Sequence, residues 1–466
     1  MEQVTTDTIC AISTPPGRGG IAVARVSGPA SIAIANAVWK GASLADAKSH
    51  TVHLGTITRP DGTALDQAVA TVFRNPRSFT GEDVVEISVH GSTFIQQELL
   101  HLLVASGARM AEPGEFTRRA FVNGRLDLAE AEAVADLIAS SSRAAHRLAI
   151  SQLQGRFSAN IDSLRQQLLD LAVLLELELD FSEEDVTFAD RAKLRELAAD
   201  IQSMVTRMAS TFSSGQALRD GIPVAIIGRP NVGKSRLLNT LLDTDRAIVS
   251  DIPGTTRDTI EDTIDIDGHT FRFIDTAGIR TTDDPIESLG IERALRSVAK
   301  ASVVIWLLSP DDLQSPDTSA NKALIDGSIR PDATLIPVLN KIDTIPDSVT
   351  QATESLSAMA PGTGPLAISA LTGTGISDLR NAILAAATAG LPDDESMIVT
   401  NARHHAALTE AADALTQLID GIDLGLTPDL LAQHLRQAIH SLATITGSIT
   451  STQILQTIFH RFCIGK

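Results

Sequence analysis

The chain has 466 residues, of which 43% are hydrophobic, and a formal net charge of −19. That length predicts two to four domains with cores of their own, and the charge excludes nonspecific nucleic-acid binding by the whole surface. The two cysteines, Cys10 and Cys463, are too few for a disulfide framework or a zinc site. The chain shows no signal peptide and no apolar run of membrane-spanning length, so we expect a soluble, cytoplasmic protein.

The first 120 residues predict a mixed α/β domain. The expected strands are Thr8–Ile12, Ile21–Val26, Ala68–Phe73 and Val84–Val89, and the expected helices are Ala30–Val38 and Thr93–Ala105. Two glycine-containing loops, Thr14–Gly20 and Ser78–Asp83, precede strands. Their spacing leaves open whether they are plain turns or parts of a binding site.

From Asp127 the pattern becomes helical, and Asp127 with Glu130 has the spacing of a capping box. The expected helices are Asn160–Leu179, Ala192–Phe212, His404–Ile422, one from Pro428 to about Leu442 after the N-cap Thr427, and Ser451–Phe462. We read Gly215–Gly221 as a linker and His404 with His405 as surface residues.

Residues 222–385 alternate apolar runs with helical stretches, which predicts a mainly parallel sheet with helices on both faces. The expected strands are Val224–Ile227, Thr270–Ile274, Val303–Leu308, Thr334–Leu339 and Leu366–Ile368. Because helices flank this region on both sides, we expect it to be inserted into one helical domain. The predicted boundaries are 1–121, 122–217, 218–386 and 387–466.

The segment Gly228–Ser235 follows a predicted strand and opens into a predicted helix, in the order of a P-loop that binds nucleoside triphosphates. Glycines let the backbone curl around phosphate oxygens, and the helix N-terminus faces negative charge. Lys234 would act on the β/γ-phosphates and Ser235 would bind Mg²⁺. The nucleotide-binding residues expected here are Asn231, Val232, Gly233, Lys234, Ser235 and Arg236.

Three further motifs follow in the order that guanine-nucleotide hydrolases use. Gly254-Thr255-Thr256 can bring a threonine to Mg²⁺, here Thr256, and Asp275-Thr276-Ala277-Gly278 can contact Mg²⁺ and the γ-phosphate. The Asp343 carboxylate of Asn340-Lys341-Ile342-Asp343 can accept two guanine N–H groups that adenine lacks, and Ser369-Ala370 suits guanine O6. These motifs predict a Ras-like GTPase domain.

Two features depart from Ras-like catalysis. Ile279 stands where a water-orienting glutamine is expected, and no arginine finger is evident in the sequence. Asn231 with the loop Ser250–Thr255 could bind a monovalent cation, and Glu287 could orient water. From the residues alone, the reading of Glu287 as an exposed acid is the stronger of the two.

Three stretches outside the nucleotide motifs resemble the MnmE (TrmE) family of tRNA wobble-uridine modification GTPases. They are the loop Thr14–Gly20, the run Asn123–Ala133 and the terminus Phe462-Cys463-Ile464-Gly465-Lys466. The resemblance covers essentially the whole chain. It implies an N-terminal α/β domain that binds folate and forms a homodimer, a helical domain, and an inserted GTPase domain.

The resemblance also implies a reaction. With an FAD-containing partner of the MnmG (GidA) family, in a heterotetramer, the protein would install an aminomethyl or carboxymethylaminomethyl group at C5 of the wobble uridine of certain tRNAs. The one-carbon unit would come from 5-formyl- or methylene-tetrahydrofolate.

Site residues follow from the resemblance position by position. Folate contacts would be Arg25, Glu86, Arg125 and Lys466, K⁺ would be held by Asn231, Ser250, Ile252 and Thr255, and Glu287 would be catalytic. The nucleotide contacts would also take in Asp251 and Pro253. Arg125 departs from the family pattern in replacing a lysine, which keeps the charge. Arg25 and Arg125 suit the glutamate tail of a folate, and Glu86 suits its pterin.

Three questions stay open. Cys463 beside Lys466 is readable as an activated nucleophile or as a packed thiol at a helix end. A ribosome-assembly GTPase of the Era or Der kind would share the nucleotide motifs but predicts a C-terminal RNA-binding domain, whereas this tail is acidic and helical. A GTP-switched assembly scaffold would lack folate binding.

Overall fold

The computed structural model describes residues 7–180, 191–246, 262–274, 287–315, 317–360, 364–389, 394–449, 455, 458–459, 462 and 465, with backbone only at 176–180, 244–246 and 287–293. The chain divides into two compact units. Unit 1 is Met1–Ile138, Ser151–Gln202 and Glu410–Lys466, and unit 2 is Ala139–Ile150 and Ser203–Thr409. Each unit is described by itself.

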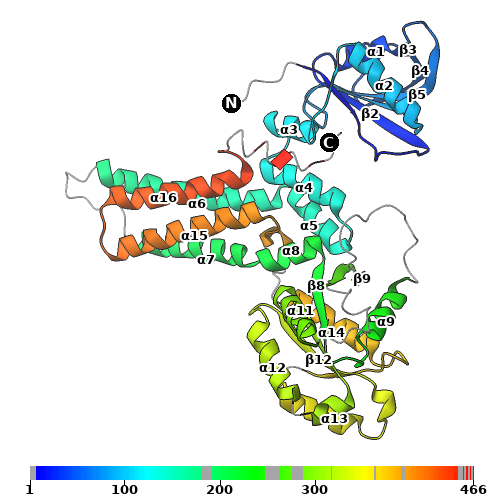
Figure 1. The fold of residues 1–466 in the computed structure, drawn as a ribbon. Helices are drawn as coiled ribbons and strands as arrows, with labels where there is room; N and C mark the ends of the chain where they lie inside the picture. The colour runs from blue at the N-terminus through cyan, green and yellow to red at the C-terminus, as the bar shows by residue number, and fades with distance from the viewer. Residues whose placement is uncertain are drawn as a thin grey trace. The chain divides into compact units, whose positions relative to one another are not determined.

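The described strands at the start of unit 1 form a sheet in the order β3-β4-β5-β6-β2-β1-β7 (Figure 1). All neighbours pair antiparallel except β1 and β7. The strands are β1 (Ile9–Ile12), β2 (Ile21–Ser27), β3 (Trp39–Gly41), β4 (Thr51–Thr58), β5 (Ala64–Phe73), β6 (Val84–His90) and β7 (Arg109–Met110). The helices are α1 (Ser31–Ala37), α2 (Thr93–Ala105) and α3 (Glu115–Val122).

The two faces of this sheet differ. Successive strand residues point to opposite faces, so Ala24 and Val26 of β2 enter the core that includes residues of α1 and α2. Arg25 and Ser27 lie on the other face, next to Glu86 of β6 in the strand register. That second face carries the polar residues described below.

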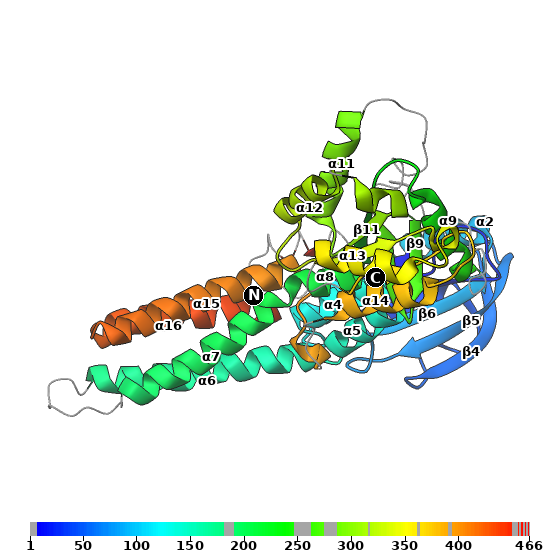
Figure 2. The same cartoon turned by 90° about the horizontal axis from the view of Figure 1, so that it is seen from below.

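Four long helices lie wholly or mainly in unit 1: α6 (Arg156–Asp180), α7 (Arg191–Ser210), α15 (Ala402–Asp423) and α16 (Pro428–Thr446). Figures 1 and 2 both show them running side by side. Arg195 of α7 pairs with Asp423 of α15 at 2.6 Å, although 228 residues separate them. The chain passes between the units at the end of α4 (Leu128–Ala139) and within α5 (Arg143–Leu153), α7 and α15.

The helix α4 (Leu128–Ala139) begins at the predicted capping box. The Asp127 amide donates to Glu130 Oε2 and the Glu130 amide to Asp127 Oδ1, both at 2.8 Å. Leu128 packs in a cluster with Leu455, Phe459 and Phe462. The C-terminal segment therefore lies against the helical part of unit 1.

Unit 2 is built on a sheet of order β13-β12-β11-β8-β10-β9 in the described residues, parallel except for the pair β9 and β10. The strands are β8 (Ile222–Ile227), β9 (Asp262–Ile266), β10 (His269–Phe273), β11 (Val303–Leu308), β12 (Thr334–Leu339) and β13 (Leu366–Ala367). The helices are α8 (Phe212–Asp220), α9 (Lys234–Arg246), α11 (Glu287–Lys300), α12 (Asp317–Ser328), α13 (Val349–Met359) and α14 (Ile376–Thr388). Short 3-10 turns occupy Pro310–Gln314, Ile342–Thr344 and Glu395–Met397.

Helices cover both faces of this sheet, as the sequence predicted. Val224 and Ile226 of β8 pack with α9 and α14, whereas Ala225 and Ile227 pack with α11, α12 and α13 on the opposite face. The fold class, an N-terminal α/β domain with a helical domain and an inserted P-loop GTPase domain, is therefore confirmed.

Two sequence expectations are wrong. Residues 212–220 form the helix α8 and not a linker. A Cβ on Gly215 would lie 2.2 Å from the Val399 carbonyl oxygen, so this glycine permits close packing and does not signal flexibility. His404 is not a surface residue, because it is only 2% exposed; its neighbour His405 stacks on Phe212 at a centroid distance of 4.5 Å.

Four strands were not predicted: the short strands β3 and β7, the eight-residue strand β4 and the antiparallel strand β9 were all missed. The expected helix Ser451–Phe462 falls largely outside the described residues. Within this range Leu455, Ile458 and Phe459 are described as helical. Among the described helices, none is both long and apolar enough to cross a bilayer.

Candidate functional site

The P-loop of unit 2 is shaped by three residues with positive φ: Gly228 (156°), Asn231 (62°) and Gly233 (103°). A Cβ on Gly228 would lie 2.3 Å from the Leu307 carbonyl oxygen. The loop therefore depends on glycine both for its backbone angles and for its space. The helix α9 begins at Lys234, so its free N–H groups lie at the end of the loop, where phosphate oxygens bind in such structures.

Lys234 Nζ donates hydrogen bonds to the carbonyl oxygens of Gly228 and Arg229, each at 2.8 Å. Burial lowers the pKa of Lys234, and the negative charge of Asp312 acts in the opposite direction. A phosphate group beside Lys234 would favour its charged form in the same way as Asp312. The loop thus fits a nucleoside triphosphate. Val232 is buried beneath it, and Arg236 is exposed on the first turn of α9.

The residues expected to bind guanine also lie close together. Ser369 Oγ donates to Asp343 Oδ1 at 2.5 Å, and the Ala370 amide donates to Asn340 Oδ1 at 3.0 Å. Lys341 has a positive φ of 63° and precedes the turn that carries Asp343. Asp343 is exposed, so its carboxylate is accessible to a base.

Asn340 joins the base site to the phosphate loop. It is 2% exposed, and its Nδ2 donates to the Val232 carbonyl oxygen at 2.8 Å. A Cβ on Gly233 would lie 2.5 Å from the same Nδ2 atom. The two sequence motifs therefore meet in one site. Their close contact requires glycine, which has no side chain, at position 233.

Other predicted nucleotide and cation residues lie outside the described part of the chain. They are Ser250, Asp251, Ile252, Pro253, Gly254, Thr255, Thr256, Asp275, Thr276, Ala277 and Gly278. Glu287 begins α11, but its side chain is not described. The roles assigned to all these residues stay predictions.

A second candidate site lies on the polar face of the N-terminal sheet. Arg25 and Glu86 stand opposite each other on β2 and β6. Arg25 Nε donates to Glu86 Oε1 at 2.9 Å, and its second nitrogen, Nη2, lies 2.8 Å from the same oxygen. The two residues therefore form a pair whose charges largely cancel, which the sequence did not predict.

Two phenyl rings lie next to the Arg25 guanidinium. Its central carbon is 5.2 Å from the centroid of Phe79 and 5.6 Å from that of Phe116. Phe79 belongs to the loop Ser78–Asp83, and Phe116 belongs to α3. Cations within about 6 Å of an aromatic centroid are attracted to the ring, so both phenyl rings stabilise the guanidinium at this position.

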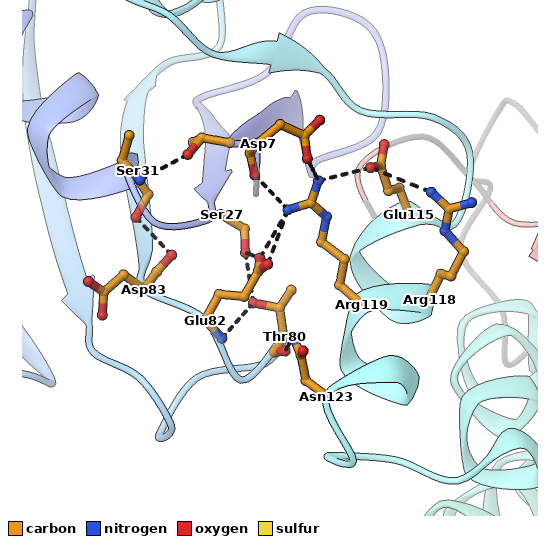
Figure 3. A network of polar contacts seen from close by, with 12 residues as sticks. Asp7, Ser27, Ser31, Thr80, Glu82, Asp83, Glu115, Arg118, Arg119 and Asn123 are labelled. Atoms are coloured by element: carbon orange, nitrogen blue, oxygen red, sulfur yellow. Dashed lines mark hydrogen bonds and ion pairs between the residues drawn. The ribbon is translucent and has the colours of Figure 1, made fainter. Parts of the chain in front are cut away.

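Behind this site, Arg119 is 3% exposed and binds three acidic residues (Figure 3). Its nitrogens lie 2.7 Å from Asp7 Oδ1, 3.1 Å from Glu82 Oε1 and 3.1 Å from Glu115 Oε1. Burial of Glu115 raises its pKa, but hydrogen bonds from Arg109, the Glu112 amide and Arg119 outweigh burial and leave that pKa below its ordinary value.

The other predicted folate residues are placed only in part. Arg125 is exposed, and it lies next to the loop Ser78–Asp83: a Cβ added at Gly81 would be 3.0 Å from Arg125 Cγ. Cys463 and Lys466 lie outside the described residues. Gly465 is described: its carbonyl oxygen accepts a hydrogen bond from Ser13 Oγ at 3.0 Å.

Sequence reasoning missed four residues of this region: Phe79, Glu82, Phe116 and Arg119. Phe79 and Glu82 lie in a loop that the sequence singled out, and Phe116 with Arg119 has helical spacing in a segment with no element predicted. Their pairing across the chain has no signal in a single sequence.

Comparison with known proteins gives matches over nearly the whole chain. The family model for the GTP-binding protein TrmE N-terminus matches residues 8–125, and that for the MnmE helical domain matches residues 128–463. A protein of Parabacteroides distasonis named tRNA modification GTPase MnmE is 48% identical over 468 residues, 98% of this chain and 100% of that protein. Its namesake from Cytophaga hutchinsonii is 47% identical over 464 residues, 99% of this chain and 98% of that protein.

Among solved structures, Era in complex with MgGDPNP and 16S ribosomal RNA is 32% identical over 41% of this chain and 66% of that chain, with a TM-score of 0.28. The assignment rests on the full-length relatives and not on this partial likeness. Together with the P-loop and the guanine site, those relatives identify a GTP hydrolase. The chain belongs to the MnmE family of tRNA modification GTPases.

Proposed function

We propose that this protein is a K⁺-activated GTPase that modifies C5 of the wobble uridine of certain tRNAs. It acts as a homodimer in a heterotetramer with an FAD-containing MnmG-family protein, and a folate supplies the one-carbon unit. Full-length relatives named tRNA modification GTPase MnmE, 45–48% identical to this chain, support the tRNA substrate.

In the nucleotide site, Lys234 and the N-terminus of α9 bind the phosphates, and Asp343 selects guanine. Ser235 and Thr256 are the side chains assigned to Mg²⁺, which supplies neutralisation of phosphate charge when bound. The close contact among Asn340, Val232 and Gly233 supports this assignment, because it joins the segment proposed to recognise the base to the loop proposed to bind the phosphates.

We assign K⁺ binding to Asn231, with Ser250, Ile252 and Thr255. Asn231 is exposed and held in the left-handed region at φ 62°, which presents its side chain at the surface of the P-loop. Glu287 is assigned to orient the attacking water in place of the missing glutamine. Cys463 keeps its two readings, nucleophile or packed thiol.

One observation carries the folate proposal: the chain's C-terminus returns to the N-terminal sheet. Phe459 and Phe462 lie against Gly114 at the start of α3, and a Cβ on Gly465 would lie 2.3 Å from the Ile12 carbonyl oxygen. Ile12 pairs with Ala24, the neighbour of Arg25 on β2. Lys466 is the next residue in the chain after Gly465, so this path supports a site shared by Arg25, Glu86, Arg125 and Lys466.

The test is reconstitution with an MnmG-family protein, tRNA, GTP and a folate, followed by mass spectrometry of the wobble nucleoside. We expect a modified C5 only when this protein, K⁺ and folate are all present. Unmodified uridine in the complete mixture, with an active partner protein, would refute the tRNA reaction. Modification that is independent of folate would refute the carbon source alone.

Hydrolysis is tested separately by Glu287→Ala and by replacing K⁺ with Na⁺ at equal ionic strength. We expect both to lower GTP turnover by at least about ten-fold with GTP binding retained, since charge neutralisation and water orientation act on the transition state. Equal turnover in the two salts would remove the cation role. Unchanged turnover of Glu287→Ala would return that residue to an exposed acid.

A further inference from the structure

Three elements meet at one carboxylate behind the Arg25–Glu86 pair. Glu82 of the loop Ser78–Asp83 accepts hydrogen bonds from Ser27 Oγ of β2 at 2.6 Å and from Arg119 of α3 at 3.1 Å. Ser27 Oγ also lies 2.7 Å from Thr80 Oγ1 of the same loop. Figure 3 shows these side chains converging from the sheet, the loop and the helix.

The same elements carry the walls of the Arg25 site. Phe116 lies three residues before Arg119 on α3, so the two side chains are neighbours on the helix. Phe79 lies three residues before Glu82 in the loop, and Arg25 lies two residues before Ser27 on one face of β2. The strand β2, the loop and α3 thus each contribute one side chain to the Arg25 site. Each also contributes one side chain to the contact among Ser27, Glu82 and Arg119.

We propose that Arg119 is a positioning residue: through Glu82 it holds the Phe79 loop and α3 together on β2, so that both phenyl rings stay next to the guanidinium of Arg25 for ligand binding. This inference rests on the proposed folate site. Arg119 itself touches no expected ligand, because it is 3% exposed and its partners are protein carboxylates and the Asp7 carbonyl.

Geometry explains why arginine is needed. Its fork reaches Asp7, Glu82 and Glu115 at the same time, whereas the single ammonium of a lysine cannot keep all three contacts. Arg109 provides a matched control. It binds Asp7 and Glu115 at 2.7 Å, and within the described residues its hydrogen bonds and ion pairs go to Asp7, Met110 and Glu115 and not to the Phe79 loop.

The experiment compares Arg119→Lys with Arg109→Lys in the full-length protein, with 5-formyl-tetrahydrofolate as the probe in calorimetry. We expect affinity to fall about ten-fold or more for Arg119→Lys and to stay within about two-fold for Arg109→Lys, although both lower the unfolding temperature. In the reconstituted reaction, Arg119→Lys should raise KM for folate while kcat at saturating folate stays near the parental value. Equal affinities, or equal losses in both variants, would overturn the proposal.

A ligand-independent measurement separates this inference from the folate proposal. Hydrogen–deuterium exchange of residues 78–83 should rise in Arg119→Lys and not in Arg109→Lys. If the parent binds no folate, the proposed function fails, but exchange still decides the role of Arg119. Unchanged exchange in Arg119→Lys would refute the positioning role.

Two further variants apply if Arg119→Lys does not fold. Glu82→Gln keeps the size of the side chain and removes its charge. Asn123→Ala removes another contact of the loop, the bond from Asn123 Nδ2 to the Thr80 carbonyl oxygen at 2.7 Å, at an exposed position. Both should raise exchange at 78–83 and weaken probe binding, and parental behaviour in both would refute the proposal.

Discussion

The two candidate sites are built in different ways. The nucleotide site of unit 2 is formed by one short loop whose shape comes from backbone angles, with positive φ at Gly228, Asn231 and Gly233. The site of unit 1 is formed by side chains from two strands, a loop and a helix, and its centre is the Arg25–Glu86 pair. A backbone site is sensitive to an added atom, whereas a side-chain site is sensitive to a lost partner.

The largest expected effect is that of adding one methyl group to the phosphate loop. Gly233→Ala places a Cβ 2.5 Å from Asn340 Nδ2 at a φ of 103°, so the Asn340 side chain or the loop must shift and the bond from Asn340 to Val232 is disturbed. We expect GTP binding to weaken by roughly a hundred-fold, about 2.7 kcal/mol. Titration with a fluorescent GTP analogue measures it.

The control is Gly425→Ala in unit 1, which has a φ of 70° and no heavy atom within 4 Å of the added Cβ. It carries the same kind of backbone strain without the clash. If both variants bind GTP like the parent, the phosphate loop tolerates a side chain at position 233. The nucleotide site would then not be sensitive to an added atom.

Base recognition is the second test, and it acts on a side chain within the backbone-built site. Asp343→Asn replaces an acceptor with a donor where guanine presents N–H groups. We expect preference to move from GTP towards xanthosine triphosphate, with roughly ten- to hundred-fold weaker GTP binding from the lost charged hydrogen bonds. Competition binding of the two nucleotides measures the shift, and undiminished GTP preference would contradict the assignment.

In the side-chain site, Arg25→Ala leaves Glu86 without its partner. We expect 5-formyl-tetrahydrofolate to bind roughly ten- to hundred-fold more weakly, which corresponds to about 1.5–3 kcal/mol for a lost charged hydrogen bond. Calorimetry measures this, and GTP hydrolysis should be unaffected. Arg59→Ala removes a different ion pair of the same domain, from Arg59 after β4 to Glu98 of α2 at 3.3 Å, and should bind folate normally. Equal binding by the two variants would place folate elsewhere.

The smallest effect concerns the pH dependence of stability. The native pKa of Glu115 lies below its ordinary value of 4.5, so its contribution to stability is present above pH 4.5 and is lost as pH falls through the lowered native pKa. Glu115→Gln should lower the unfolding temperature at pH 7 by about 2–4 °C for each kcal/mol of unfolding free energy lost. It should also make stability fall less steeply as the pH is lowered. Thermal melts from pH 7 to pH 3 test it.

The matched control is Glu112→Gln, since the Glu112 side chain is 64% exposed and lies 3.7 Å from Arg118. This variant should keep the parental acid dependence. A Glu115→Gln protein that loses stability with falling pH as steeply as the parent would show that the buried pairs of Glu115 contribute little.

The structure agrees with the sequence where local pattern decides. The strands Val303–Leu308 and Thr334–Leu339 and the helix Thr93–Ala105 have the predicted bounds, because continuous apolar runs and helical periodicity are local properties. The capping box at Asp127 is confirmed for the same reason. The errors at Gly215 and His404 arise where distant backbone or packing decides burial.

The sequence by itself determined the family, the P-loop, the guanine motif and the division into α/β and helical regions, because glycines and fixed spacings encode them over short distances. Only the tertiary structure decided that Arg25 is paired with Glu86 and lies next to Phe79 and Phe116, that Arg119 joins three acidic residues, and that Gly465 lies against the end of β1. Arg25 and Glu86 are 61 positions apart in the sequence, and Ser13 and Gly465 are 452 positions apart. Such pairs form only when packing brings the segments together, and no local pattern records them.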